Sequence, residues 1–138
     1  MKKILVMISL LVINVIFAYQ VIGEEQAIIL QGIIKDKDRY NAEKADINYK
    51  VYYDVDEKNK TVKRLYLENM KNNETINDST EYAIIENYIN PLDNKKYIKA
   101  VGKPANPSLE LLVIGEKNIL SSRSTLGYIV LTEMKRIK

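Results

Sequence analysis

Apolar and polar residues alternate most regularly in the stretch 46–55, DINYKVYYDV. One face of this stretch carries only large apolar or aromatic side chains, those of Ile47, Tyr49, Val51, Tyr53 and Val55. The other face carries mostly polar side chains, together with Tyr52. A period of two, filled with β-branched and aromatic residues, is typical of a strand that is buried on one side. We therefore predict a half-buried strand here.

A second strand is predicted to return over 61–70, TVKRLYLENM, after a turn at 57–60. Burial favours one register of this hairpin, because each large apolar side chain contributes roughly 1.5–3 kcal/mol when buried. A slip by one residue would expose the whole apolar set. The favoured register pairs Val55 with Val62, Tyr53 with Arg64, Val51 with Tyr66 and Ile47 with Met70.

The reverse face of this hairpin also carries apolar side chains. Tyr52 is predicted to lie opposite Leu65, and Leu67 follows on the same face. Either a helix or a second sheet covers these side chains, or they form a surface for a partner. Tyrosine suits a binding surface because it offers a large contact area with a wet hydroxyl, and the chain has 10 Tyr against one Phe and no Trp. Tyr52, Leu65 and Leu67 are the candidate binding patch.

The rest of the chain predicts shorter elements and contains no internal repeat. Further strands are expected over 26–35, 95–102, 108–115 and 124–134, with polar connections over 36–45 and 71–80. About six strands with little helix predict a mainly β domain, either an antiparallel β-sandwich or a small barrel.

The segment 80–89, TEYAIIENYI, fits two structures. As a helix it has Ser79 or Thr80 at the N-cap and ends at Asn90, because Pro91 disfavours the α region there. As a strand it places Tyr82 and Ile84 on one face. We predict one short helix here and keep a strand as the alternative.

The first residues have the pattern of an export signal. Two lysines precede an uncharged apolar stretch over 4–18, which is shorter than the run of about 20 residues that spans a bilayer. Small residues at Ala18 and Gly23 are candidate cleavage positions. We predict a signal peptide over 1–23, cleaved after Ala18 or after Gly23.

Cleavage would release a single mainly β domain over 24–138, secreted or periplasmic. The alternative is an uncleaved segment that anchors the protein in the membrane through residues 4–22. The length of the domain is common for one hydrophobic core.

The amino-acid composition excludes several kinds of catalysis and metal binding. The chain contains no Cys and no His. Their absence excludes Ser-His-Asp and Cys-His catalysis and disulfides, and it removes the usual ligands of structural zinc. The acidic residues Asp54 and Asp56 are interpreted as turn residues, because Lys58 and Asn59 stand where a calcium loop needs an oxygen ligand and Gly. We predict no catalytic residue, no metal and no cofactor.

The formal net charge is +3, and two of the positive charges leave with the signal segment. A near-neutral domain favours no nucleic-acid partner. The abundance of Ile, Lys and Asn is typical of proteins from AT-rich bacterial genomes.

We expect an exported bacterial protein, not an enzyme, with a binding or structural role at the cell envelope or outside the cell. Its partner is expected to be a protein or an envelope polymer. One alternative is a small carboxylate-dependent hydrolase that acts on a wall polymer. Another is an accessory subunit of an envelope complex, tethered by an uncleaved N-terminus. The oligomeric state stays open.

Overall fold

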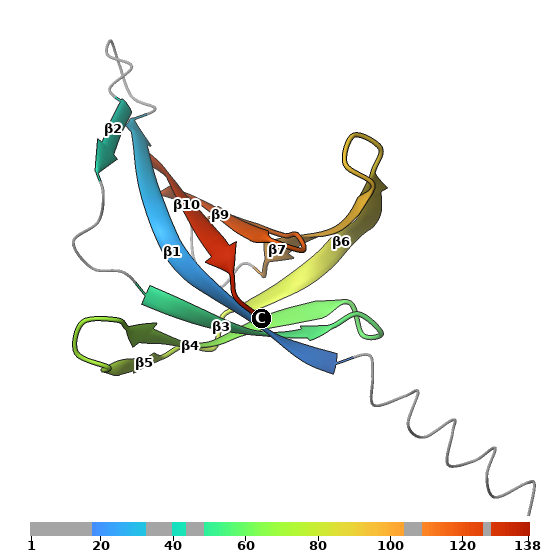
Figure 1. The fold of residues 1–138 in the computed structure, drawn as a ribbon, viewed down its shortest axis with the longest axis horizontal. Coiled ribbons are helices and arrows are strands. Elements are labelled where there is room, and N and C mark those ends of the chain that lie inside the picture. Colours follow the sequence, from blue (N-terminus) through green and yellow to red (C-terminus); the bar gives the residue numbers. More distant parts are fainter. Residues whose placement is uncertain (1–17, 33–39, 44–48, 104–108, 126–127) are drawn as a thin grey trace, which may run out of the picture.

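The computed structural model describes residues 18–32, 40–43, 49–103, 109–125 and 128–138 (Figure 1). Every regular element in these ranges is a β-strand, and none is a helix. The strands are β1 (Ala18–Gly32), β2 (Tyr40–Glu43), β3 (Tyr49–Asp56), β4 (Thr61–Asn69), β5 (Thr75–Asn77), β6 (Glu81–Asn90), β7 (Lys95–Gly102), β8 (Leu109–Ile114), β9 (Asn118–Thr125) and β10 (Tyr128–Arg136).

Eight of these strands form a closed antiparallel ring in the order β1-β3-β4-β6-β7-β8-β9-β10, and β10 pairs back with β1. Ring members that follow one another in the chain are neighbours in space, so the fold is an up-and-down barrel. β2 and β5 lie outside the ring and pair with β1 and β4. Of the two architectures expected from the sequence, the small barrel is the one that forms.

Inward-facing side chains fill the barrel with an apolar core. An eight-stranded ring is just wide enough for side chains to fill it or for one small ligand to be held. The largest fully buried side chains include Tyr53 and Tyr82. The remaining core residues are Val21, Val51, Val55, Val62, Ile98, Ala100, Leu112, Ile114, Ile119 and Met134.

β1 is the longest strand, with 15 residues, and it closes the ring. Its first half pairs with β3, its second half pairs with β2, and its other edge pairs with β10. Gly23 stands where these ladders overlap. A Cβ at this position would lie 3.0 Å from Ile119 Cδ1 and 3.0 Å from Met134 Sδ, so a larger residue here would require these two core side chains to shift.

The β3–β4 hairpin confirms the predicted register near its turn. Val55 pairs with Val62, and Tyr53 pairs with Arg64. Val55 and Val62 are fully buried, as the burial argument requires. The predicted partner of Met70, Ile47, lies outside the described residues.

Beyond this point a β-bulge in β4 changes the register. Tyr52 pairs with Tyr66, and Val51 pairs with Leu67, so Leu65 is the extra residue. The predicted pairs of Val51 with Tyr66 and of Tyr52 with Leu65 are therefore wrong. A bulge increases local twist and bends the strand, which a strand in a closed barrel needs.

Residues 81–89 lie in the strand β6, so the predicted short helix is wrong. Tyr82 is fully buried in the barrel and Ile84 packs against the core, while Ile85 is 58% exposed and Ile89 is 64% exposed. A helix would have grouped Tyr82 with Ile85 and Ile89. Pairing with β7 from Tyr82 to Asn90, interrupted by a β-bulge between Ile84 and Glu86, shows that the segment is a strand.

Other predicted boundaries also change. The single strand expected over 124–134 is two strands, β9 and β10, which pair with each other. The expected connections over 36–45 and 71–80 contain the short strands β2 and β5. No helix of the described part is long and apolar enough to cross a membrane.

Candidate functional site

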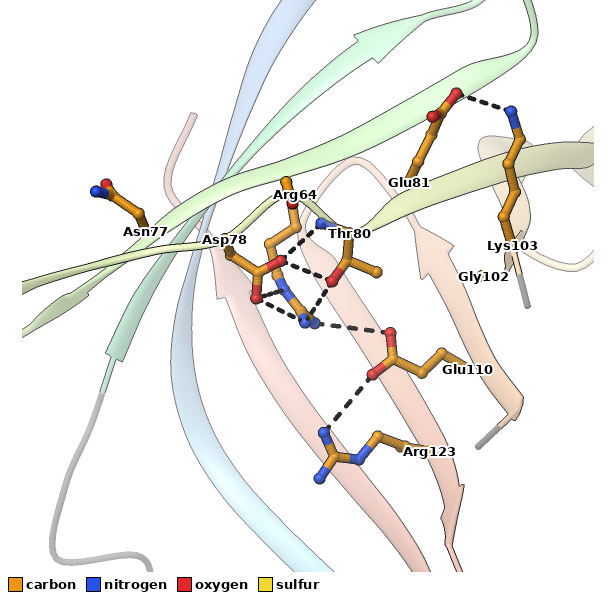
Figure 2. Close-up of a pocket in the computed structure, with 10 residues that line it drawn as sticks. Arg64, Asn77, Asp78, Thr80, Glu81, Gly102, Lys103, Glu110 and Arg123 are labelled. Carbon is orange, nitrogen blue, oxygen red and sulfur yellow. Dashed lines mark hydrogen bonds and ion pairs between the residues drawn. The ribbon is translucent and has the colours of Figure 1, made fainter. Parts of the chain in front are cut away.

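A cavity of about 690 Å³ lies where β4 and β6 diverge. These antiparallel strands pair over only three positions, Thr61 to Lys63 of β4, and then separate. The cavity is lined from β4, from the segment that joins β5 to β6, and from β7, β8 and β9. Figure 2 shows the side chains of Arg64, Asp78, Thr80, Glu110 and Arg123 pointing toward one another, while Glu81 and Lys103 face each other on the rim and Asn77 points away.

Arg64 of β4 is the centre of this cluster. Its Nε and Nη2 atoms lie 3.1 and 2.9 Å from Oδ2 of Asp78, and Nη2 also donates to Thr80 Oγ1 at 3.1 Å. Nη1 donates to the hydroxyl of Tyr82 at 3.0 Å. Burial lowers the pKa of Arg64, but Tyr82, Asp78 and Glu110 outweigh this effect and raise it. The guanidinium is thus held in one position as a cation.

The loop before β6 is shaped to receive Arg64. Oδ1 of Asp78 accepts hydrogen bonds from the backbone N–H of Thr80 at 2.7 Å and from its hydroxyl at 2.6 Å. This is the local turn that Asp side chains favour. Burial raises the pKa of Asp78, but the hydrogen bonds from Thr80 and Arg64 outweigh it, so the pKa lies below its usual value.

Glu110 of β8 is a buried carboxylate, 9% exposed. It shares the inward face of β8 with Leu112 and Ile114. Of these three residues, Glu110 is the one that lines the cavity. Its Oε2 accepts a hydrogen bond of 2.8 Å from Tyr82 and lies 3.8 Å from Arg64 Nη1. Burial raises the pKa of Tyr82, so its hydroxyl stays protonated and remains a donor.

The other oxygen of Glu110 faces Arg123 of β9. Arg123 Nη1 lies 3.8 Å from Oε1, which is too long for a hydrogen bond. The Arg123 side chain is 52% exposed, and Glu110 is its ion-pair partner within the described ranges. The Glu110 oxygen Oε1, an acceptor, and the Arg123 guanidinium, a donor, therefore lie next to each other at the cavity. Each can form a further hydrogen bond.

The charges around the cavity balance. Three cations line it, Arg64, Lys103 and Arg123, and three acids, Asp78, Glu81 and Glu110. Lys103 bonds Glu81 at 2.8 Å on the rim, and this ion pair lowers the pKa of Glu81. The cavity thus offers paired charges of both signs and no net field of one sign.

The structure does not bring the three patch residues onto one face. Tyr52 stacks on Tyr66 with ring centroids 4.2 Å apart, and its hydroxyl donates to Glu68 at 2.9 Å. Burial and the Glu68 carboxylate raise the pKa of Tyr52 to about 12. Leu67 packs against the core, and Leu65 is the bulge residue. A role of Tyr52 in partner binding stays a prediction.

Two of the cavity residues carry a signal in the sequence. Glu110 is a lone charge on the apolar alternation of 108–115, and Arg64 was placed on the apolar face opposite Tyr53. A charge on a buried face needs a partner, which marks a site. Asp78 stands in a polar loop and carried no such signal.

The acidic turn of the β3–β4 hairpin has structural partners. Asp56 accepts hydrogen bonds from the backbone and side chain of Asn59 at 3.0 and 2.7 Å. Glu57 bonds Lys96 and Asn87. Within the described ranges no group of three acidic side chains is placed to hold a metal ion.

Comparison with protein-family models, with curated proteins and with solved structures gives no match. The class of the protein is therefore defined by its fold and cavity alone. It is an eight-stranded up-and-down antiparallel barrel with a buried Arg–Glu–Tyr cluster at the floor of a polar cavity.

Proposed function

We propose that this chain is an exported bacterial binding protein, without catalytic activity, that holds a small polar ligand in the cavity between β4 and β6. One observation carries the proposal: Glu110 Oε1 and the Arg123 guanidinium form an ion pair at 3.8 Å, too long for a direct hydrogen bond, so a third group can hydrogen-bond to both. Arg64 and Tyr82 hold Glu110 from behind, so the site is organised before any ligand enters. Such preorganisation reduces the cost of binding.

The chemistry of the pair selects the ligand. A molecule that donates to Glu110 and accepts from Arg123 must carry donor and acceptor groups close together. Each hydrogen bond to a charged group contributes about 1.5–3 kcal/mol. Hydroxyl-rich or amide-rich molecules, such as the sugar and peptide units of envelope polymers, have this arrangement. The volume of about 690 Å³ fits a small ligand.

The ion pairs of the acidic side chains at the cavity favour binding over hydrolysis as the function. Asp78 is bonded to Arg64, Glu81 is bonded to Lys103, and both pKa values are lowered. A general acid needs a raised pKa, and a glycosidase needs two carboxyl groups facing one bond. A carboxylate-dependent hydrolase is therefore the second candidate. A membrane-tethered accessory subunit, anchored through residues 4–22, is the third.

The test is a binding screen with envelope-type fragments, namely monosaccharides, disaccharides and short peptides, followed by calorimetry. The wild-type protein should bind at least one fragment, and Arg123→Gln should weaken that binding at least tenfold, about 1.4 kcal/mol. Lys135→Gln, on an exposed residue of β10, is the control and should bind like wild type. Turnover of a fragment that Glu110→Gln abolishes would favour the hydrolase instead.

A further inference from the structure

The two oxygens of Glu110 have different partners. Oε2 accepts the hydrogen bond from Tyr82 and lies on the side of Arg64, whereas Oε1 lies 3.8 Å from Arg123 Nη1. Figure 2 shows the Glu110 carboxylate between the two guanidinium groups. The Arg64 guanidinium is engaged by Tyr82 and by the loop before β6, and the Arg123 side chain is 52% exposed. Oε1 and the Arg123 guanidinium therefore present one negative and one positive charge to a molecule in the cavity.

A ligand that covers these two charges must replace their water. Glu110 is only 9% exposed, so a molecule lying on it removes much of its remaining contact with solvent. A charged group that loses water is destabilised unless an opposite charge or a hydrogen bond takes its place. A neutral hydroxyl supplies only a dipole to each group, whereas an ammonium and a carboxylate each supply a full opposite charge. The pair therefore favours a ligand with a cation for Glu110 and an anion for Arg123.

The other charges of the cavity favour a ligand that is neutral overall. Lys103 is paired with Glu81 on the rim, and Arg64 is paired with the loop before β6, so the charges of the lining sum to zero. A simple anion would satisfy Arg123 but would bring a like charge toward Glu110, and a simple cation would do the reverse. A zwitterion, which carries one charge of each sign, avoids both conflicts.

The distance between the two groups limits how far apart the charges of the zwitterion can lie. Charge-assisted hydrogen bonds measure about 2.7–2.9 Å. A ligand that bonds both Glu110 Oε1 and Arg123 Nη1, which are 3.8 Å apart, therefore needs its ammonium and carboxylate close together. In an α-amino acid, the N–Cα and Cα–C bond lengths and the angle between them place the nitrogen about 2.5 Å from the carboxylate carbon. The four charged groups then form a ring in which the sign of the charge alternates.

We propose that the cavity binds a free α-amino acid, with its ammonium group on Glu110 Oε1 and its carboxylate on the Arg123 guanidinium. This inference rests on the proposed function of the cavity as a ligand site, and it names the chemical class of the ligand. Tyr82 and Arg64 hold Glu110 in place from one side, and Arg123 completes the site from β9. The cavity volume of about 690 Å³ leaves room for the side chain of the amino acid.

The first experiment measures the binding of the protein amino acids to the full chain, one at a time, by calorimetry. We expect at least one to bind. Its amide, which lacks the carboxylate charge, and its α-hydroxy acid, which lacks the ammonium charge, should each bind about tenfold more weakly or worse. If no amino acid binds, but a sugar or peptide fragment binds and Arg123→Gln weakens it, the amino-acid proposal is wrong and the cavity remains a ligand site. If nothing binds, both proposals fail.

The second experiment assigns the carboxylate of the ligand to Arg123. Arg123→Gln should remove the preference for the amino acid over its amide and keep the preference over the α-hydroxy acid. Lys103→Gln, on another cation of the same cavity, is the matched control and should keep both preferences. Circular dichroism confirms that each variant is folded. Equal binding of amino acid and amide by wild type, or an unchanged preference in folded Arg123→Gln, overturns the proposal.

Discussion

The hydroxyl of Tyr82 donates a hydrogen bond of 2.8 Å to Oε2 of Glu110, inside the barrel and away from water. The two residues stand on β6 and β8, which β7 separates in the ring. The same hydroxyl accepts from Arg64, so one atom joins the acid and the cation at the floor of the cavity. The polar cluster is thereby fixed to the apolar core that surrounds the Tyr82 ring.

Tyr82→Phe should therefore destabilise the protein although it changes only one atom. The ring still fills the core, but Glu110 and Arg64 each lose a partner while remaining buried. Leaving such groups unsatisfied costs about 1–3 kcal/mol. Urea unfolding followed by circular dichroism measures the loss. Tyr97→Phe, whose hydroxyl bonds Asp93 at the surface, should change stability by less than about 0.5 kcal/mol. Equal effects in the two variants would contradict the role given to Tyr82.

Asp78 should contribute to stability in a pH-dependent way. Its pKa in the folded state is lower than the ordinary value of 3.8, so its contribution is complete above that value and is lost as the pH falls through it and below. Asp78→Asn should cost about 1–3 kcal/mol at neutral pH, and the difference from wild type should shrink in acid.

Urea midpoints at a series of pH values test the prediction for Asp78. Asp54→Asn, in the pair with Lys63 near the hairpin turn, serves as control. A difference between Asp78→Asn and wild type that stays constant into acid would show that the Asp78 charge has no part in stability.

Glu25 is expected to affect the pH dependence of stability in the opposite direction. Burial raises its pKa, although its Oε2 accepts a hydrogen bond of 3.2 Å from the backbone N–H of Tyr49. An acid with a raised folded pKa favours the folded state at low pH, and its ionisation reduces stability as the pH rises through that pKa. Glu25→Gln keeps an acceptor for Tyr49 and removes the charge. We expect a higher melting temperature than wild type at neutral pH, with the gain disappearing in acid. A lower melting temperature at neutral pH would refute this.

The start of β1 determines which cleavage position is compatible with the barrel. Val21 is fully buried, and Ile22 exchanges backbone hydrogen bonds with Ile137 and Lys138 at 3.0 and 3.2 Å. A cut after Gly23 would remove these contacts and most of the ladder to β3, whereas a cut after Ala18 would keep them. Residues 19–138 should therefore unfold cooperatively in urea, and residues 24–138 should not.

The mass of the native protein tests the proposed cleavage independently of the truncated chains. It should correspond to a chain that starts at Tyr19. Cooperative unfolding of 24–138 with the midpoint of the longer chain would show that the first half of β1 is dispensable.

The period of two along 46–55 was sufficient to predict the hairpin and its pairs next to the turn. The bulge at Leu65 was not predictable, because it depends on the curvature of the closed barrel and not on the local sequence pattern. The residues beyond it therefore changed faces, and Leu67 moved from the predicted patch to a position that packs against the core. The segment 80–89 satisfied both helical and strand periods locally, and only its long pairing with β7 decided between them.

The cavity was less predictable than the fold. Arg64 and Glu110 could have been singled out as charges on apolar faces, but their contact depends on strands far apart in the chain. Asp78 reaches Arg64 only because β5 diverts the chain before β6 begins. Pairings of this kind follow from closure of the ring, which no single stretch of sequence specifies.

Closure of the ring also has a kinetic consequence. The neighbouring strands β6 to β10 are joined by short connections, and such hairpins form in microseconds once both strands exist. The pair of β1 with β10 is different, because it joins Gly23 to Arg136 across nearly the whole described chain. Contacts of such high sequence separation slow folding. Sealing of the barrel by β1 should therefore be the last and slowest step, and a nascent chain would persist as an open, curved sheet until its final strand has been synthesised.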